Sequence, residues 1–434
     1  MLPGFTKICE NEGILKACTR CNWVYYCNQN CQKEAWNSHH KSECKYLQKQ
    51  NMPQPVKEHF DGNCHDIQLG HLKMLKTILK LKNSGREDFF QLPNGKRRYF
   101  TDLMSNAHEL RKQKEQMNQS KEYVLQYAVF KTWIGDAMPS FTDYFEIMGK
   151  WQTNATSISA MNFCSPVIIA SGLYLGYSSF DHSCAPNASW INVGKEMVVR
   201  AIEDVENLSE IRISYFDCYE NTQKRRRYLR ERYFFDCKCV RCEDPNSDAK
   251  FSALKCKSCP GWVIESSKIC SSCHQTLKLS DEEFTTVEKY KNGTLPKFEP
   301  AMPLKEIKSL LEKYTKIFHG FHEIFRQSGE VIEFPILRSQ YKLGNLDTIR
   351  LFLELRKLKL NFLSGHLPQF HQDFGYLHFL NSFECTKLKL FDEAKFHMKK
   401  AEIMMKVAFG EEHPYTQECQ ECSIAFQSSI VAMK

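Results

Sequence analysis

The sequence predicts an α+β protein with a β-rich core stapled by zinc, a helical insert and an all-helical C-terminal domain. Three observations predict this class. The chain of 434 residues contains 20 cysteines, many of them clustered at spacings typical of metal ligands. Short β-prone runs separated by turns fill residues 189–216. Apolar residues recur every three or four positions over residues 65–150 and again beyond residue 300, as in helices.

Composition limits the class of protein further. With 42% apolar and 12% aromatic residues, the chain can bury a sizeable core, and we expect two or three domains. We find no signal-peptide pattern and no apolar run of the roughly 18 residues that a membrane span needs. We therefore expect a protein of the nucleus or cytoplasm without membrane contact, and in a reducing compartment cysteines indicate metal sites. The net charge of +8 permits an acidic partner without requiring one.

Residues 1–46 are expected to form a zinc finger, on the basis of "KACTRCNWVYYCNQNCQKEAWNSHHKSEC". Three pairs of candidate ligands stand at CxxC, CxxxC and HxxxC spacing: Cys18 with Cys21, Cys27 with Cys31, and His40 with Cys44. Zinc takes four tetrahedral thiolate or imidazole ligands, and pairs at this spacing can turn back onto one ion. The pattern resembles the MYND zinc finger, whose ligands alternate between two ions.

By that resemblance two sets of ligands hold two zinc ions: Cys18, Cys21, His40 and Cys44 the first, and Cys9, Cys27 and Cys31 the second. The second set is one ligand short, because Thr6 stands where the family has a cysteine and a neutral hydroxyl binds zinc poorly. His39 is an alternative to His40, although "HKSEC" fits the family ending better. MYND fingers bind proline-rich peptides, which makes Trp36 a candidate contact. The alternative is a purely structural lobe in which Trp36 packs.

Residues 47–160 are expected to form a helical insert. Apolar residues recur at three and four positions in "LGHLKMLKTILKLK", "HELRKQKEQ" and "KEYVLQYAVFKTWI", which is typical of amphipathic helices. Residues 83–100 contain Gly, Pro and Asn-Gly, so a loop or short connection is expected there.

Residues 161–245 are expected to form the β-rich core. The loop "FDHSCAPN" precedes three β-prone runs, "SWINV", "MVVRAI" and "IRISYF". After the runs, "DCKCVRC" supplies three thiols that lack a fourth partner: Cys237, Cys239 and Cys242. Cys184 of the loop is the candidate for the fourth ligand. A site closed through Cys184 would pin the loop against the segment that follows the strands.

These motifs together resemble one family. "FDHSCAPNASW", "RISYFD" and "RERYFFDCKCVRC", in that order and behind a MYND-like finger, resemble the catalytic core of the SMYD proteins, which combine SET and MYND domains. The resemblance covers residues 9–242. It implies a SET fold and the transfer of a methyl group from S-adenosylmethionine to protein lysines.

The resemblance also implies roles for individual residues. Four of them would contact the cofactor: Asp181, His182, Tyr215 and Phe235. Tyr215, near the transferred methyl group, and Tyr233, in the wall of the lysine channel, are the catalytic candidates. Aromatic walls suit a sulfonium and a methylated ammonium, which are both cations, and an in-line displacement needs alignment more than acid–base groups. Taken alone, Tyr233 and Phe235 would favour a place in the core; their position just before the zinc cysteines favours the roles that the resemblance implies, in the lysine channel for Tyr233 and against the cofactor for Phe235.

Two departures from the family pattern bear on activity. The family has asparagine where this chain has Asp181, whose carboxylate offers acceptors alone but attracts a cationic cofactor. In the family, a SET segment with a glycine-centred loop that cradles the cofactor precedes the finger, whereas no GxG loop precedes Cys9 here. The resemblance therefore implies a SET core that lacks its N-terminal segment, with exposed sheet edges and an open cofactor pocket, or a start assigned in the wrong place.

Residues 246–280 are expected to form a zinc ribbon, because two CxxC knuckles flank a short β-prone loop. Its four ligands are Cys256, Cys259, Cys270 and Cys273. Residues 300–434 are expected to form a helical domain, since Gly-containing turns recur about 46 residues apart, and SMYD proteins have a tetratricopeptide-like (TPR-like) domain at this place. Three cysteines in its helical patterns are expected to be buried small residues: Cys385, Cys419 and Cys422.

The predicted function is S-adenosylmethionine-dependent N-methylation of protein lysines, with histones among the candidate substrates, by a monomer. The alternative is a non-catalytic SET and MYND adaptor that recruits protein partners in transcription or chromatin regulation. An adaptor has no reason to retain affinity for the cofactor. Direct binding of DNA is the least favoured class, because "QKRRRYLRERY" stands where the family has a charged amphipathic helix and favours a solvated face.

Overall fold

The computed structural model describes residues 16–48, 73–117, 119–160, 167–193, 196–326 and 328–432. The chain divides into two compact units. The first comprises the residues up to Phe180 together with 191–198 and 229–235; the second comprises 181–190, 199–228 and 236 onward. Within the described ranges, we find no helix that is both long and apolar enough to span a bilayer.

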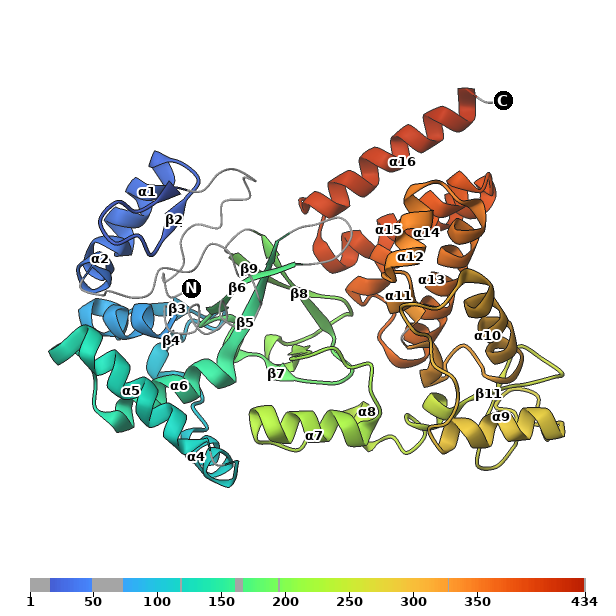
Figure 1. Ribbon diagram of the computed structural model, residues 1–434, viewed down its shortest axis with the longest axis horizontal. Helices are drawn as coiled ribbons and strands as arrows, with labels where there is room; N and C mark the ends of the chain where they lie inside the picture. The colour runs from blue at the N-terminus through green and yellow to red at the C-terminus, as the bar shows by residue number, and fades with distance from the viewer. Residues whose placement is uncertain are drawn as a thin grey trace. The chain divides into compact units, whose positions relative to one another are not determined.

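The finger consists of a small hairpin followed by a continuous helical run (Figure 1). Asn28 caps the run, because its side chain accepts a hydrogen bond from the backbone N–H of Cys31 at 2.9 Å and so satisfies a free donor of the first turn. A π-helical turn within the run changes the direction in which the following side chains point. The elements are β1 (Lys16–Ala17), β2 (Tyr25–Tyr26), α1 (Gln29–Ala35), the π-turn (Trp36–His40) and α2 (Lys41–Leu47).

The insert is helical but includes a β-hairpin where the sequence predicts a loop. The Asn-Gly pair forms its turn: Gly95 donates its N–H to the carbonyl of Leu92 at 2.9 Å and has a φ of +83°, which glycine adopts without strain. Asn-Gly between β-prone runs is a hairpin signal. The elements are β3 (Phe89–Gln91), β4 (Arg97–Tyr99), α4 (Ala107–Gln116), α5 (Ser120–Ile134) and α6 (Phe141–Asn154).

The described strands of this region form three two-stranded sheets, β5 with β6, β8 with β9, and β7 with β10, and the three β-prone runs lie in the last two. β7 and β10 pair in parallel, with Asp181 opposite Arg212 and His182 opposite Ile213. This pairing places the "FDHSCAPN" loop beside the segment that leads to Tyr215. The elements of this region are β5 (Ala155–Ala160), β6 (Val167–Leu173), β7 (Asp181–His182), β8 (Ala188–Val193), β9 (Glu196–Ala201), β10 (Arg212–Ile213), α7 (Thr222–Tyr233) and α8 (Val240–Glu243).

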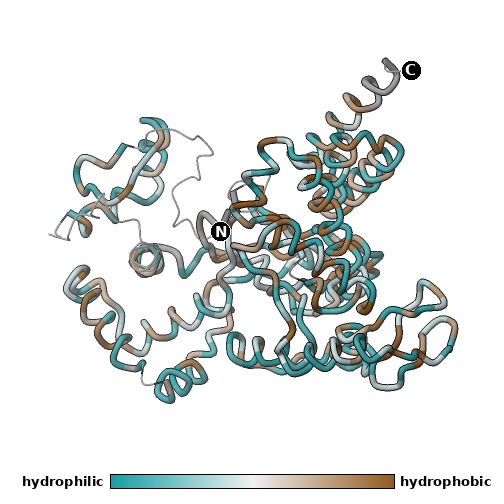
Figure 2. Tube along the Cα trace, turned by 45° about the vertical axis from the view of Figure 1, so that its right-hand side comes forward, coloured by the Kyte–Doolittle hydropathy of each residue, from teal (hydrophilic) through white to brown (hydrophobic). Residues whose placement is uncertain are grey.

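A small ribbon and a run of helices complete the second unit. Helices α13 to α16 pack successively on one another (Figure 1), and apolar and polar residues alternate along them (Figure 2). His371 and His413 have matching roles, since the Nδ1 atom of each ring accepts a backbone N–H at the start of α14 and of α16. Such recurrence is a property of stacked helical hairpins. The elements are β11 (Leu254–Lys255), β12 (Trp262–Val263), α9 (Asp281–Lys291), α10 (Leu304–Ile317), α11 (Ser328–Val331), α12 (Pro335–Lys342), α13 (Leu346–His366), α14 (Gln372–Lys387), α15 (Phe391–Phe409) and α16 (Pro414–Ala432).

Candidate functional site

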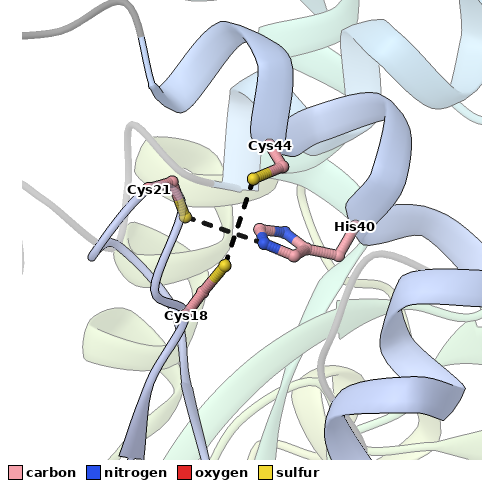
Figure 3. Close-up of side chains that lie close together, drawn as sticks. All are labelled: Cys18, Cys21, His40 and Cys44. Atoms are coloured by element: carbon pink, nitrogen blue, oxygen red, sulfur yellow. Dashed lines mark hydrogen bonds between the residues drawn. The ribbon is translucent and has the colours of Figure 1, made fainter.

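Four candidate ligands of the finger converge on one point (Figure 3): Cys18, Cys21, His40 and Cys44. All four are buried, and their ligand atoms lie within 4.8 Å of one another. Sγ of Cys18 lies 4.0 Å from Sγ of Cys44, and Sγ of Cys21 lies 3.6 Å from Nε2 of His40. Tetrahedral zinc separates two sulfurs by about 3.8 Å and a sulfur and a nitrogen by about 3.6 Å. The arrangement therefore fits zinc.

A buried carboxylate supports the histidine of this cluster. Glu43 lies 3.6 Å from Nδ1 of His40 and 3.3 Å from the ammonium of Lys76. Burial opposes the ionisation of Glu43, but the interaction with His40 and the charge of Lys76 outweigh it and lower its pKa. A carboxylate behind a histidine fixes the orientation of the ring that binds a metal. His39 points elsewhere, with its Nδ1 2.8 Å from the hydroxyl of Ser38.

The second set of finger ligands is described in part. The sulfurs of Cys27 and Cys31 lie 3.1 Å apart at the start of α1. Cys9 and Thr6 lie outside the described residues, so this set rests on sequence spacing.

The loop cysteine joins the three cysteines that follow α7. Cys184, Cys237, Cys239 and Cys242 place their sulfurs within 4.8 Å of one another. Sγ of Cys184 lies 4.0 Å from that of Cys237 and 3.6 Å from that of Cys242. These are the separations of a tetrahedral thiolate site, and a metal bound here would pin the loop after β7 to the segment after α7.

Two buried arginines enclose this cluster. Arg225 is fully buried and donates to Sγ of Cys242 at 3.5 Å. Arg241 is 8% exposed and donates to the carbonyls of Cys184 and Cys218 at 3.1 and 2.8 Å. Burying guanidinium groups is costly unless negative charge compensates them. Zinc bound by four thiolates keeps a double negative charge that two guanidinium groups neutralise, so the arginines fit a metal-loaded site.

The sequence reasoning missed these arginines and one further thiol. It favoured a solvated face for "QKRRRYLRERY", yet Arg225 is buried and Arg226 donates to the carbonyls of Cys237 and Cys242. Cys218 is buried near His182 and Cys184. Cys218 belongs to no spaced pair of cysteines in the sequence. Its position directly after "RISYFD" is the sequence feature that could have placed it near His182.

His182 connects the thiol cluster to the candidate catalytic tyrosine. Its Nδ1 accepts the backbone N–H of Tyr215 at 3.1 Å, and its Nε2 lies 3.2 Å from Sγ of Cys184. Burial lowers the pKa of His182 to about 4, so the ring is neutral. Because Nδ1 accepts, the proton must sit on Nε2 and point at Cys184. The rings of His182 and Tyr215 lie 5.2 Å apart, whereas the side chain of Asp181 is exposed.

Asn187 completes the loop. Its amide nitrogen donates to the carbonyl of Glu210 at 3.0 Å, and its amide oxygen accepts the N–H of Arg212 at 2.7 Å. The histidine and the asparagine of "FDHSCAPN" thus both hold the segment around β10, and the cysteine joins the thiols that follow α7.

Tyr233 and Phe235 flank a strained residue in the first unit. Phe234, which ends α7, has a φ of +61°, a conformation that costs a bulky residue about 1–3 kcal/mol. Its ring packs against the cluster formed by Ala107, Leu110 and Phe145. The carbonyl of Tyr233 accepts the side-chain amide of Asn106 at 3.3 Å. The packing of Phe234 therefore fixes the turn between Tyr233, the candidate channel residue, and Phe235, the candidate cofactor contact.

The ribbon holds a third thiol cluster. Its four sulfurs lie within 4.8 Å of one another, with Cys256 3.7 Å from Cys273 and Cys259 3.6 Å from Cys270. Backbone N–H groups of Ser258, Gly261 and Ser272 point at three of the sulfurs at 3.3–3.4 Å. Such donors stabilise thiolates, so this site also fits zinc.

Comparisons with known proteins agree with the motifs. Residues 7–44 match the MYND finger family model. Human histone-lysine N-methyltransferase SMYD3 is 29% identical over 238 residues, or 54% of this chain and 50% of that protein; the match thus spans half of that relative. Histone-lysine N-methyltransferase ASHR1 of Arabidopsis thaliana is 26% identical over 440 residues, or 94% of this chain and 84% of that protein. Human N-lysine methyltransferase SMYD2 is 22% identical, covering 95% of this chain and 86% of that protein.

Proposed function

This chain belongs to the SET and MYND (SMYD) family, and we propose that it is a protein-lysine N-methyltransferase that uses S-adenosylmethionine. The names of the relatives, histone-lysine and N-lysine methyltransferases, support the reaction class. We propose a protein substrate, with histones as candidates, and the nucleus or cytoplasm as the compartment.

The observation that carries the proposal is the assembly of His182, Tyr215 and Cys184. The histidine ring binds the backbone of Tyr215 through one nitrogen and lies against the thiol of Cys184 through the other. Tyr215 is therefore held by the same loop that the thiol cluster anchors. Pre-organised alignment of this kind is what an in-line transfer requires. Both ring nitrogens of His182 contact other groups of the chain. His182 would therefore contact a cofactor through its backbone.

The reaction requires that the lysine amine be oriented toward the methyl group. S-adenosylmethionine, held by the backbone of His182 and by Tyr215, would supply the lysine nitrogen with a methyl group from a sulfonium, and a neutral thioether would be the leaving group. The hydroxyl of Tyr215 can accept an N–H of the neutral lysine and so direct the lone pair. Tyr233, as a wall of the lysine channel, would attract the methylated ammonium by cation–π interaction, and Phe235 would contact the cofactor.

We propose zinc as the ion of the cysteine and histidine clusters. Cys237, Cys239 and Cys242 would hold it with Cys184, and the finger and ribbon clusters would hold one ion each. The separations of the ligand atoms and the buried arginines support this assignment. The ions would shape the loops and take no part in the transfer.

Calorimetric titration with S-adenosylmethionine tests the proposal. We expect micromolar binding by the zinc-loaded chain and loss of that binding in the double variant Tyr215→Phe, His182→Ala. Tyr25→Phe, which changes an exposed tyrosine of the finger, should bind normally. Transfer of a labelled methyl group to histones or to extract proteins then tests the reaction. If the folded chain bound no S-adenosylmethionine, the proposed methyltransferase activity would be refuted.

The second candidate function is a non-catalytic adaptor, which the match of residues 7–44 to the MYND finger favours. Trp36 is a candidate contact for a proline-rich peptide; in the structure Arg20 lies over its ring at 5.0 Å. A chain that binds such a peptide but no cofactor would be the adaptor.

A further inference from the structure

The helical hairpin of α14 and α15 encloses a polar cluster that the proposed reaction does not use. Cys385, Glu393 and His397 place one ligand atom each within 4.8 Å of the others. Cys385 is fully buried, as the sequence predicts for a small core residue, and His397 is 4% exposed. A thiol, a carboxylate and an imidazole converge here at a place where a hairpin normally packs apolar side chains.

Local geometry brings the three groups together. Glu393 and His397 are four positions apart on α15 and so share one face. Cys385 lies in the last turns of α14, where its carbonyl accepts the N–H of Leu390 at 2.8 Å and closes the connection to α15. This short turn fixes Cys385 opposite the first turns of α15, where the other two side chains start.

A second histidine supports the first. Nδ1 of His378, on α14, lies 2.7 Å from Nδ1 of His397. Two nitrogens that bind one tetrahedral zinc would be about 3.3 Å apart, so this distance is that of a hydrogen bond in which one ring donates and the other accepts. A histidine that binds a metal usually has its other nitrogen held in this way. His378 is thus a positioning residue.

Charge is consistent with a cation at this place. A thiolate and a carboxylate together balance the charge of a divalent ion; Cys385 and His397 are buried, whereas the side chain of Glu393 is 36% exposed. Lys357 forms an ion pair with Oε1 of Glu393, which leaves the other carboxylate oxygen for a metal. Thiolate, imidazole and carboxylate in one set favour zinc over calcium or magnesium.

We propose that Cys385, Glu393 and His397 form a zinc site that clamps α14 to α15, with His378 orienting His397 and water in the fourth position. This site is separate from the three thiol clusters described above. It would brace the helical domain without any part in methyl transfer.

Metal content of the full chain tests the site, with Cys385→Ala and Cys419→Ala as a matched pair. Both cysteines are fully buried in helices of the same domain, and Cys419, whose sulfur lies 4.0 Å from that of Met398, belongs to none of the ligand clusters among the described residues. Mass spectrometry of the dialysed proteins should show about one zinc ion per chain fewer in Cys385→Ala and no loss in Cys419→Ala. Equal zinc content in wild type and Cys385→Ala, or equal loss in both variants, would overturn the proposal.

Three further variants keep the test decisive if Cys385→Ala folds poorly. His397→Gln should lose the same ion, and in cobalt-loaded protein should lose the thiolate-to-cobalt absorption of this site. His378→Ala should weaken zinc binding, measured by competition with a chelator, about 10–100-fold. His378→Gln, which retains a hydrogen-bonding group, should recover much of that affinity. A cobalt spectrum that is identical in wild type and His397→Gln would refute the site.

Discussion

Nδ1 of His182 accepts the backbone N–H of Tyr215 at 3.1 Å, which ties the ring of a loop residue to the segment that carries the candidate catalytic tyrosine. The loop is tied in turn to the thiol cluster through Cys184. Cofactor binding, metal binding and stability of this region should therefore change together.

His182→Ala should destabilise the chain. It leaves the N–H of Tyr215 without its buried acceptor, which costs about 1–3 kcal/mol of the free energy of unfolding. Urea denaturation measures the loss. His108→Ala, at an exposed position on α4, is the control and should change the free energy little. Equal effects of the two substitutions would contradict the role of His182.

Arg225→Ala should weaken metal binding at the Cys184 cluster. It removes one of the two buried positive charges near the thiolates and leaves their negative charge partly uncompensated, at a cost of about 3–5 kcal/mol. Zinc release to a chelator should quicken, whereas the exposed neighbour Arg227, changed to Ala, should leave the release rate as it is. A release rate unaffected by Arg225→Ala would show that the guanidinium does not balance a metal site.

The ribbon should not tolerate Gly261→Ala. A Cβ at Gly261 would lie 2.5 Å from Oγ of Ser272 and 3.0 Å from Sγ of Cys270, so the knuckles must move apart. We expect a loss of about 1–3 kcal/mol and weaker zinc retention. Gly329→Ala is the matched control, because its Cβ would find its nearest neighbour at 3.8 Å. If both variants melt alike, the close approach at Gly261 is not a constraint.

Buried His366 should make stability depend on pH. Burial lowers its pKa to about 3, while its Nε2 lies 2.8 Å from the carbonyl of Phe321. The unfolded chain therefore binds the proton more readily, so this contribution is fully present above pH 6.5 and is lost as the pH falls from there towards 3. In wild type the free energy of unfolding should fall as the pH drops below 6.5, and in His366→Asn this slope should be smaller by about 1.4 kcal/mol per pH unit. Urea denaturation at pH 7.5 to 5 measures the slope; parallel curves would contradict the assignment.

Spacing in the sequence predicted the contacts that depend on short repeats. The CxxC pairs come together in the structure, and so do Cys184 and its three distant thiols, as the ligands of one tetrahedral ion must. The β-prone runs at 189–193, 197–202 and 211–216 correspond to β8, β9 and β10. The parallel pairing of β7 with β10 was beyond prediction, since two-residue strands carry no periodic signal.

The burial of Arg225 and the contact between His378 and His397 depend on residues that are distant in the sequence, so the sequence alone does not predict them. Arg225 looks like any residue of a charged run, and its burial depends on thiolates that are supplied from both sides of α7. His378 and His397 stand 19 residues apart on different helices, and their contact follows from the hairpin that joins those helices. The hairpin at 89–99 is predictable from the sequence, because Asn-Gly between two β-prone runs is a signal for a hairpin turn as well as for a loop.

The two arginines around the Cys184 cluster should make folding of the newly synthesised chain depend on zinc. Their burial is favourable beside negatively charged sulfur, and a bound zinc ion would keep the four sulfur atoms deprotonated and together. A newly synthesised chain that meets no zinc would keep α7 undocked, with cysteines and aromatic residues open to oxidation and to proteases. Cells short of zinc should therefore contain less of this protein, through faster turnover and at unchanged synthesis.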